Sequence, residues 1–359
     1  METVVTRLGT CAASSTVSAA FIALACTMSG HAQAPVPVAS GAAPPGDVVV
    51  GSGSYSPIVQ DLDKAIEFYA NLLGLSVPPA QTPGPRPFGS DPALLHMFGL
   101  PGAQLRYVTA RIPGAPVGVE MVEVKGLDRM PIHPRPQDPG GTTLILLVRD
   151  IDTAFAPLKR AGVKVITPGG EPLAFGPENR ASGILVADPD GHFVELLQPN
   201  PLPDTTAPAG SNVIGARVRL TIADTDRTMR IYKDVLQFQP QVGAFGSIPL
   251  LDLMGLKGAQ LRLTNAQVPG STLRLEFIEL KGVEGTAIKP RLQDPGATRL
   301  QIRVRDLDAT MEKLKASGST VISTGGQAAT LQGGVRAAIM PDPNGLFVVL
   351  LQARAPQNP

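Results

Sequence analysis

Four stretches of the chain share one pattern of apolar and polar positions. Each stretch has an alternating strand that ends in an Asp-x-Asp pair, and a helix follows whose apolar residues recur every three or four positions. Short β-like runs broken by Gly and Pro come after each helix, for example ALLHMFGL, AQLRYVTA and GVEMVEV after the first. The pattern predicts four units, each a strand, a helix and about three further strands, and therefore an α+β fold.

The aspartate pairs stand at the same place in all four units. Two carboxylates could hold a metal ion, but an aspartate at the head of a helix usually accepts hydrogen bonds from the first free backbone N–H groups. We therefore interpret the pairs as helix caps. They are Asp61/Asp63, Asp150/Asp152, Asp224/Asp226 and Asp306/Asp308.

The second half of the chain repeats the first. GLPGAQLR, which begins at Gly99, returns as GLKGAQLR at Gly255, and VEMVEVKG and RPQDPG return in similar form after the same 156 positions. Such a constant offset indicates that a segment of two units was duplicated. The predicted organisation is a first domain at residues 48–199, a linker at 200–212, a second domain at 213–352 and a tail at 353–359.

The first 34 residues have the pattern of an export signal. Arg7 precedes an apolar stretch, and the small-residue cleavage pattern HAQA ends at Ala34. Cleavage after Ala34 is the preferred interpretation, and lipoprotein processing at Cys26 is the alternative. Both cysteines precede Ala34, so the mature protein has no disulfide, and residues 35–47 form a Pro/Ala-rich tether. We expect a periplasmic or secreted protein without a membrane span after signal removal.

The charge of the chain argues against nucleic acid as a partner. The formal net charge is +1, and no basic run or basic patch with interleaved aromatic residues occurs. We expect a small-molecule ligand, and the sequence leaves a homodimer open as the assembly.

The four units resemble the vicinal oxygen chelate superfamily. The resemblance rests on DLDKAIEFYANLLGL at the head of the first unit, on DPDGHFVELLQP at the end of the second, and on the paired units over residues 50–352. This superfamily includes glyoxalase I, the extradiol dioxygenases, fosfomycin-resistance enzymes and bleomycin-binding proteins. The resemblance implies two tandem domains, each a pair of βαβββ units that form a cupped mixed sheet.

The resemblance also implies where a divalent metal would be held. In this superfamily up to four residues on the first and last strands of two units bind the metal, usually His, Gln or Glu, and the metal binds two neighbouring substrate oxygens. In the first domain these positions are Ser54, Glu120, Thr143 and Glu195. Glu120 and Glu195 are the candidate ligands of Mg, Mn, Ca, Fe or Zn. The alternative is that both only form hydrogen bonds inside a ligand cavity.

The second domain carries other residues at these positions. They are Arg217, Glu276, Arg299 and Val349. An arginine stays protonated and cannot ligate a metal, so we expect no metal in this domain. Strand alternation places Arg219, Gln301 and Arg303 on the same face as the two arginines. We interpret this set as a clamp for a carboxylate, a phosphate or another oxygen-rich ligand, with ion pairs at the mouth of the cup as the alternative.

Three histidines remain after signal cleavage. His96 could point into the first cup and replace a missing ligand, and a partly buried polar role is the alternative. His192 stands three residues before Glu195, so the two side chains point to opposite faces of their strand. His133 precedes PRPQDPG, which returns as PRLQDPG; because Asp-Pro-Gly favours a turn, we interpret both segments as rigid crossovers between units.

These residues leave three hypotheses for function. The first is an exported enzyme that transforms a small oxygen-rich molecule by lyase, isomerase or dioxygenase chemistry, with a metal in the first domain. The second is a metal-free binding protein similar to the bleomycin-binding members, which uses the cup as a pocket. The third is a structural or interaction protein whose cups are filled by side chains.

Overall fold

The computed structural model describes residues 41–80, 84–176, 178 and 180–354. The predicted signal at 1–34, the start of the tether and the end of the tail lie outside the described residues. All described residues fall in one compact unit, Ala39–Pro359. Within these ranges, no helix is long and apolar enough to cross a membrane.

The first half contains the two predicted units, and the α+β class is confirmed. The first unit comprises β1 (Val49–Val59), α1 (Leu62–Ile66), the π-helical turn η1 (Glu67–Leu72), α2 (Pro92–Phe98), β2 (Gln104–Arg111) and β3 (Gly118–Lys125). The second comprises β4 (Thr142–Val148), α3 (Ile151–Arg160), β5 (Leu173–Phe175), β6 (Ala181–Ala187) and β7 (Phe193–Gln198).

The second half repeats this order. The third unit comprises β8 (Val213–Ile222), α4 (Thr225–Met229), the π-helical turn η3 (Arg230–Val235), β9 (Gln241–Gly246), α5 (Leu250–Leu253), β10 (Gln260–Gln267) and β11 (Arg274–Lys281). The fourth comprises β12 (Thr298–Val304), α6 (Leu307–Ala316), the 3₁₀ turns η4 (Thr324–Gly326) and η5 (Gln332–Gly334), β13 (Ala329–Thr330), β14 (Arg336–Pro341) and β15 (Phe347–Gln352).

The first aspartate of each predicted pair caps a helix. The side chain of Asp61 accepts hydrogen bonds from the backbone N–H groups of Asp63 and Lys64 at the start of α1. The corresponding aspartates cap α3, α4 and α6 through Asp150, Asp224 and Asp306. The interpretation of these aspartates as caps is confirmed.

One predicted β-run is wrong, because ALLHMFGL forms helix α2 in place of a strand. Asp91 caps its N-terminus by accepting from the N–H groups of Ala93 and Leu94, and Pro92 occupies the first turn. Gly99 ends the helix with a left-handed φ of 64°. The apolar residues of α2 pack in one cluster with residues of the first and fourth units, including those of β13 and β14. Because most of them are apolar, their pattern resembles that of a buried strand.

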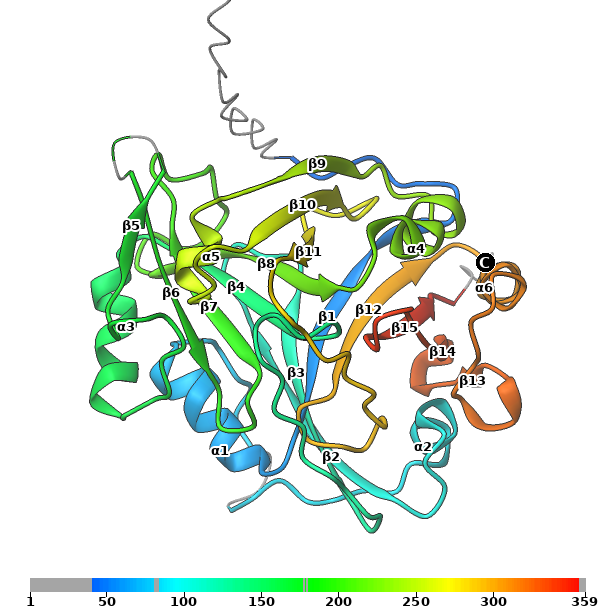
Figure 1. Ribbon diagram of the computed structural model, residues 1–359. Helices are drawn as coiled ribbons and strands as arrows, with labels where there is room; N and C mark the ends of the chain where they lie inside the picture. The colour runs from blue at the N-terminus through cyan, green and yellow to red at the C-terminus, as the bar shows by residue number, and fades with distance from the viewer. Residues whose placement is uncertain (1–40, 81–83, 177, 179, 355–359) are drawn as a thin grey trace, which may run out of the picture. The chain divides into compact units, whose positions relative to one another are not determined.

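The strands form two mixed sheets, and each sheet joins one unit from each half of the chain. The first, here called sheet A, has seven strands in the order β13-β14-β15-β12-β1-β3-β2, and the second, sheet B, has eight in the order β5-β6-β7-β4-β8-β11-β10-β9. In Figure 1, β1 (blue) runs beside β12 (orange), and the two strands pair antiparallel.

The prediction that each sheet combines two units is confirmed, but the partners differ from those expected. The first unit pairs with the fourth in sheet A, and the second pairs with the third in sheet B. The assignment of one cup to each half of the chain is therefore wrong. A repeat shows which segments are alike, and it does not show which of them pair.

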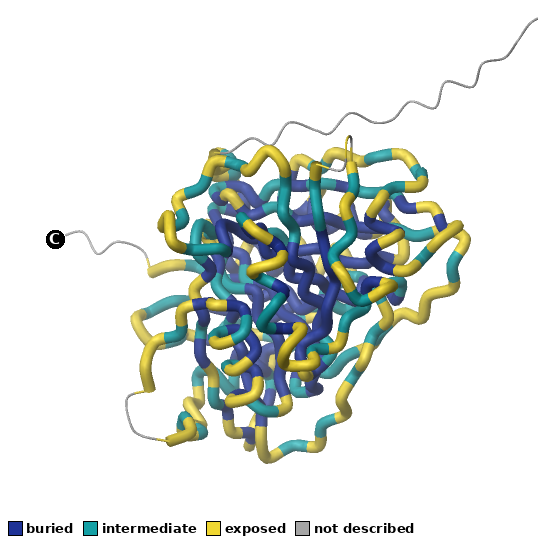
Figure 2. Tube along the Cα trace, turned by 90° about the vertical axis from the view of Figure 1, so that its left-hand side faces the viewer, coloured by how far each residue is buried: buried dark blue, intermediate teal, exposed yellow. Residues whose placement is uncertain are grey.

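The outer faces of both sheets pack on the helices in one continuous apolar core. This core includes Tyr55 of β1, Leu144 of β4, Val218 of β8 and Leu300 of β12. Figure 2 shows the buried residues gathered inside the fold and the exposed residues along the connecting loops. The inner faces carry separate apolar clusters, which α2 completes on sheet A and α5 completes on sheet B.

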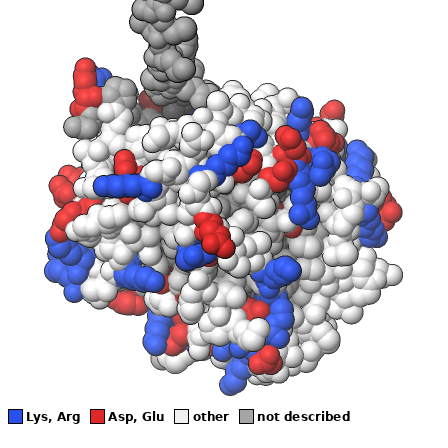
Figure 3. All heavy atoms as spheres, in the orientation of Figure 1, with Lys and Arg blue, Asp and Glu red and all other residues white. Residues whose placement is uncertain are grey.

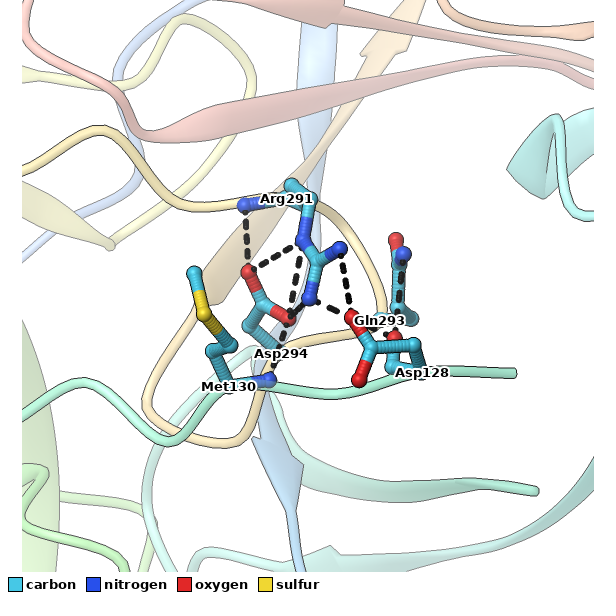
Figure 4. Close-up of polar contacts among 5 residues, drawn as sticks. All are labelled: Asp128, Met130, Arg291, Gln293 and Asp294. Carbon is cyan, nitrogen blue, oxygen red and sulfur yellow. Dashed lines mark hydrogen bonds and ion pairs between the residues drawn. The ribbon is translucent and has the colours of Figure 1, made fainter. Parts of the chain in front are cut away.

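The two crossover segments are linked by hydrogen bonds that connect the two halves of the chain. Asp294 accepts hydrogen bonds from the N–H of Met130 (2.9 Å) and from Arg291, and Arg291 also bonds Asp128 (Figure 4). The equivalent Asp138 accepts from the N–H of Thr286 (2.8 Å) and from Arg135 in the same way. The retained RPQDPG and RLQDPG motifs therefore link the two halves. The arginine of each motif donates hydrogen bonds to the aspartate of the same motif.

Candidate functional site

The predicted ligand positions are divided between the two sheets. Glu120 and Ser54 of the first half lie in sheet A with Arg299, Gln301 and Val349 of the second half. Glu195 and Thr143 lie in sheet B with Arg217, Arg219 and Glu276. Glu120 and Glu195 are on different sheets, so the expectation of one metal site that contains both is wrong.

The inner face of sheet B holds a buried Glu–Arg–Glu cluster. Arg219 donates from Nη1 to Glu195 and from Nε and Nη2 to Oε2 of Glu276, at 2.9 and 2.7 Å. All three side chains are buried, with exposed fractions of 6% for Arg219, 2% for Glu195 and 5% for Glu276. Arg217 adds a longer contact of 3.3 Å from Nη1 to Oε1 of Glu276. The guanidinium of Arg219 thus lies between two carboxylates.

The charges in this cluster stabilise one another. Burial lowers the pKa of Arg219, but the charges of Glu195 and Glu276 outweigh burial and leave that pKa above its ordinary value. Burial raises the pKa of Glu276, but Arg219 and Arg217 bring it below its ordinary value. Both shifts favour the ionised pair, so Arg219 and Glu276 stay charged at neutral pH.

The inner face of sheet A is built around a single carboxylate. Oε2 of Glu120 accepts from Ser56 Oγ at 2.8 Å and from Arg299 Nη2 and Gln301 Nε2, both at 3.0 Å. Within the described part of the chain, Ser54 contributes its backbone N–H alone, which donates to Gln301 Oε1 at 3.0 Å. Ser56, which is not among the predicted ligand positions, therefore makes the side-chain contact with Glu120 that was expected of Ser54.

Arg299 is the most deeply buried charged residue of this face. Its exposed fraction is 1%, and its guanidinium lies 4.4 Å from the ring centroid of Phe98 in α2. Its Nε is buried and has no hydrogen-bond partner among the described residues. Burial lowers the pKa of Arg299, and the one neighbouring carboxylate, Glu120, compensates only in part.

The two sheets correspond position by position. Ser56 pairs with Arg299 across β1 and β12, and the equivalent Arg219 pairs with Thr143 across β8 and β4. In sheet B the buried arginine of the cluster, Arg219, belongs to the third unit, and it contacts Glu195 in addition to Glu276. Sheet A has its arginine on the fourth unit, and Val349 stands at the position of Glu195 within the apolar cluster.

These residues do not fit a divalent metal. In sheet B both carboxylates already hold a guanidinium, whose positive charge occupies the space between them and repels a cation. In sheet A one carboxylate faces Arg299, and Val349 offers no donor atom. Among the described residues, no group of three or more His, Cys, Asp or Glu side chains is placed to hold an ion.

A pocket lies beside sheet A at its β2 edge. It has a volume of ≈ 500 Å³, and its lining includes Leu105 and Tyr107 of β2, Leu94 of α2, Asp91 and Pro87. Tyr107 is 49% exposed. Burial, followed by the charges of Glu120 and Asp91, raises the pKa of Tyr107. The lining therefore combines apolar side chains with the hydroxyl of Tyr107, the carboxylate of Asp91 and the guanidinium groups of Arg86 and Arg106.

The remaining predicted site residues have different surroundings. His96 lies in α2, and its Nε2 is buried without a partner among the described residues. Arg303 is exposed on β12. His192 is buried, with its Nε2 3.1 Å from the carbonyl oxygen of Ile58 and its Nδ1 3.3 Å from Thr298 Oγ1. It therefore has a structural role at the junction of the sheets.

On the face drawn in Figure 3, acidic and basic side chains are interspersed. That face carries no broad field of one sign, so recognition of a charged ligand there would depend on local groups.

Residues 53–196 match the family described as Glyoxalase/Bleomycin resistance protein/Dioxygenase superfamily. No curated protein matches the chain. Among solved structures, glyoxalase I from Zea mays is 19% identical with a TM-score of 0.52, and the match covers 85% of this chain and 92% of that chain.

A second solved structure, from Bacillus subtilis subsp. subtilis str. 168, is described as a candidate dioxygenase. It is 12% identical with a TM-score of 0.50, and the match covers 88% of this chain and 87% of that chain. At these identities the likeness concerns the fold. Residues 53–196 therefore belong to the Glyoxalase/Bleomycin resistance protein/Dioxygenase superfamily, as the resemblance to vicinal oxygen chelate proteins predicted, and the second half of the chain repeats their fold.

Proposed function

We propose that this protein binds a small molecule without a metal ion, in the pocket beside β2 of sheet A. The observation that carries the proposal is the pairing of each candidate metal carboxylate with a guanidinium, Glu195 and Glu276 with Arg219 and Glu120 with Arg299. The pocket supplies apolar walls for most of a ligand and polar groups for its orientation.

The chemistry of the pocket suggests the kind of ligand. Leu94, Leu105 and Pro87 offer an apolar surface, and the ring of Tyr107 can stack on a planar or apolar group. The lining also includes Tyr107, Asp91 and Arg86, whose hydroxyl, carboxylate and guanidinium can bond the polar end of a ligand. A small amphipathic molecule fits this combination.

Binding and metal content test the proposal together. We expect the purified protein to bind a member of a library of small amphipathic molecules, detected by ligand-observed NMR, with the same affinity with and without a chelator. Tyr107→Ala should weaken this binding about 10-fold or more, because an aromatic wall and a hydroxyl are lost. Val242→Ala, which truncates an exposed residue on β9 of the other sheet, is the matched control and should bind as the wild type does.

The opposite result would favour the enzyme hypothesis. A stoichiometric divalent metal in the purified protein that is lost in Glu120→Ala/Glu195→Ala would contradict metal-free binding and support lyase, isomerase or dioxygenase chemistry.

We also propose that the protein is exported, on the signal pattern of residues 1–34. N-terminal sequencing of protein recovered from the periplasm or medium should begin at Pro35. A lipid-modified Cys26 at the N-terminus would replace this prediction with lipoprotein processing, and full-length protein in the cytoplasm would contradict export.

A further inference from the structure

The inner face of sheet B carries more positive than negative side chains. Arg217, Arg219 and Arg274 face two acids, Glu195 and Glu276. Arg219 bonds both acids, whereas among the described residues Arg217 makes one contact, of 3.3 Å, with Glu276. The excess charge therefore falls on Arg217 and Arg274.

Arg217 and Arg274 are direct neighbours across two strands. They are register partners in the parallel pair of β8 and β11, and the next partners on the same face are Arg219 and Glu276. Burial, followed by the charge of Arg217, lowers the pKa of Arg274, and the charge of Glu276 offsets this only in part. No hydrogen bond or ion pair of the Arg274 side chain is found in the part of the chain that the structure describes.

Two like charges at neighbouring register positions of a sheet repel each other and lower the stability of the fold. A bound group of opposite charge between them would offset this repulsion. The duplicate half offers a comparison, because Ser54 and Gly118 stand where sheet B has Arg217 and Arg274. The fold therefore does not need this pair of arginines, and their repulsion lowers the stability of sheet B. Two adjacent guanidinium groups can bind one oxyanion through several parallel N–H···O bonds.

We propose that Arg217 and Arg274 form an oxyanion site on the inner face of sheet B, for the carboxylate or phosphate group of a small ligand. Asn265 of β10 is the register partner of Glu276 and is half-buried, so its amide lies on the strand next to the site. This site is on the other sheet from the β2 pocket, and it does not depend on the proposed function.

The site can be tested with inorganic phosphate and with succinate as probes, at an ionic strength held constant with chloride. We expect calorimetric binding of at least one probe to the wild-type protein, and a rise in its melting temperature with that probe. Phosphate alone would indicate phosphate esters as the ligand class, and succinate would indicate carboxylates. Binding of neither probe beyond the chloride control would overturn the proposal.

The variant Arg274→Gln gives a second, opposed readout. It should weaken binding of the probe about 10-fold or more. Without the probe and at low salt, its melting temperature should equal or exceed that of the wild type, because the repulsion is removed. A purely structural arginine would instead lower the melting temperature, and that result, or unchanged probe affinity, would contradict the site.

Two controls separate this proposal from others. Arg303→Gln removes an exposed arginine of sheet A and should leave probe binding unchanged; an equal loss would show general attraction to charge and overturn the site. Tyr107→Ala disrupts the β2 pocket and should also leave probe binding unchanged, so failure of either proposal is seen without the other.

Discussion

At the scale of single residues, the exchange of Glu195 for Val349 follows from where each sheet has its arginine. Arg219 is buried on the inner face of sheet B, and two carboxylates, Glu195 and Glu276, compensate its charge. Ser56 stands at the position of Arg219 in sheet A, so a second acid there would be buried without an additional cation. The acid at the last strand and the arginine at the first therefore vary together between the sheets.

Arg219→Ser tests this coupling, because it gives sheet B the residue that sheet A has at 56. The variant should lose about 3–5 kcal/mol of unfolding free energy, since Glu195 and Glu276 lose the guanidinium that bonds both of them and stay buried. Adding Glu195→Val, the residue at 349, should recover at least about 1 kcal/mol of this loss. Urea unfolding at pH 7 measures both. A double variant no more stable than the single one would show that Glu195 and Arg219 are not coupled.

The Asp-Pro-Asp-Gly turn before β7 gives a second prediction, on pH dependence. Burial, followed by the charge of Asp188, raises the pKa of Asp190 from 3.8 to about 6, while Asp190 also lies near His192 and Asp61. Because the native state then binds a proton that the unfolded chain releases, this contribution to stability is complete below pH 3.8 and is lost as the pH rises through about 6.

The second half has Asn344 at this place, and its Oδ1 accepts from the N–H of Ala223 as Asp190 accepts from Gln60. Asp190→Asn should therefore be more stable than the wild type at pH 7 by about 1–3 kcal/mol, with a smaller difference at pH 4.5. The reciprocal Asn344→Asp should lower stability at pH 7. Urea unfolding across this pH range measures both, and equal stability of Asp190→Asn and wild type at pH 7 would refute the argument.

The residues of the site could be predicted in part from the sequence. Alternation correctly groups Arg217 with Arg219 and Arg299 with Gln301, because it fixes the face of a strand. It does not fix the position along that face, so counting back from the capping Asp61 predicts Ser54, although Ser56 contacts Glu120. The irregular register of β1 between Ser52 and Tyr55 is set by pairing with β12, which no local pattern reveals.

At the scale of elements, the caps were predictable and α2 was not recognised. Its signals are present in the sequence, since Asp91 and Pro92 begin the helix and Gly99 ends it. Its apolar run nevertheless also fits a buried strand, because most of its side chains lie against sheet A and few polar positions mark a helical face. The helix matters for function because Leu94 lines the pocket and Phe98 covers Arg299.

The end of α2 provides a test with a matched control. Gly99 has a φ of 64°, and a Cβ there would come within 2.3 Å of the carbonyl oxygen of Ile322, whereas Gly102 has a φ of 81° and open space around it. Gly102→Ala should cost about 1 kcal/mol for the left-handed backbone, and Gly99→Ala about 2–4 kcal/mol because the clash displaces α2 as well. Denaturant unfolding measures the costs. Equal costs would show that the contact with Ile322 has no effect.

At the scale of the whole molecule, the repeat predicts four units and their order but not their pairing. Equivalent residues of the two halves meet in the structure, as Thr142 and Thr298 do with their hydroxyl oxygens 2.9 Å apart. Asp138 and Asp294 each accept a backbone N–H from the other half. A repeated sequence is equally compatible with sheets formed inside one half and with sheets formed from units of both halves. Contacts between residues far apart in the sequence decide between these two arrangements.

This pairing predicts that neither half folds alone as a stable monomer. Residues 41–199 contain β1 without its neighbour β12 and β4 without its neighbour β8, so each half would expose two unpaired strand edges. We expect light scattering after gel filtration to give dimers or aggregates for each half alone, since a second copy can supply a missing unit. The two halves expressed together should give a one-to-one complex.

The same pairing predicts the behaviour of a nicked chain. A protease site inserted within residues 200–212 should allow complete cleavage of the linker, yet the halves should elute together and unfold in one transition, because both sheets span them. The uncleaved insertion variant controls for the effect of the added residues. A first half that elutes as a monomer and unfolds cooperatively would mean that each half closes its own sheet, and the paired-sheet architecture would then be excluded.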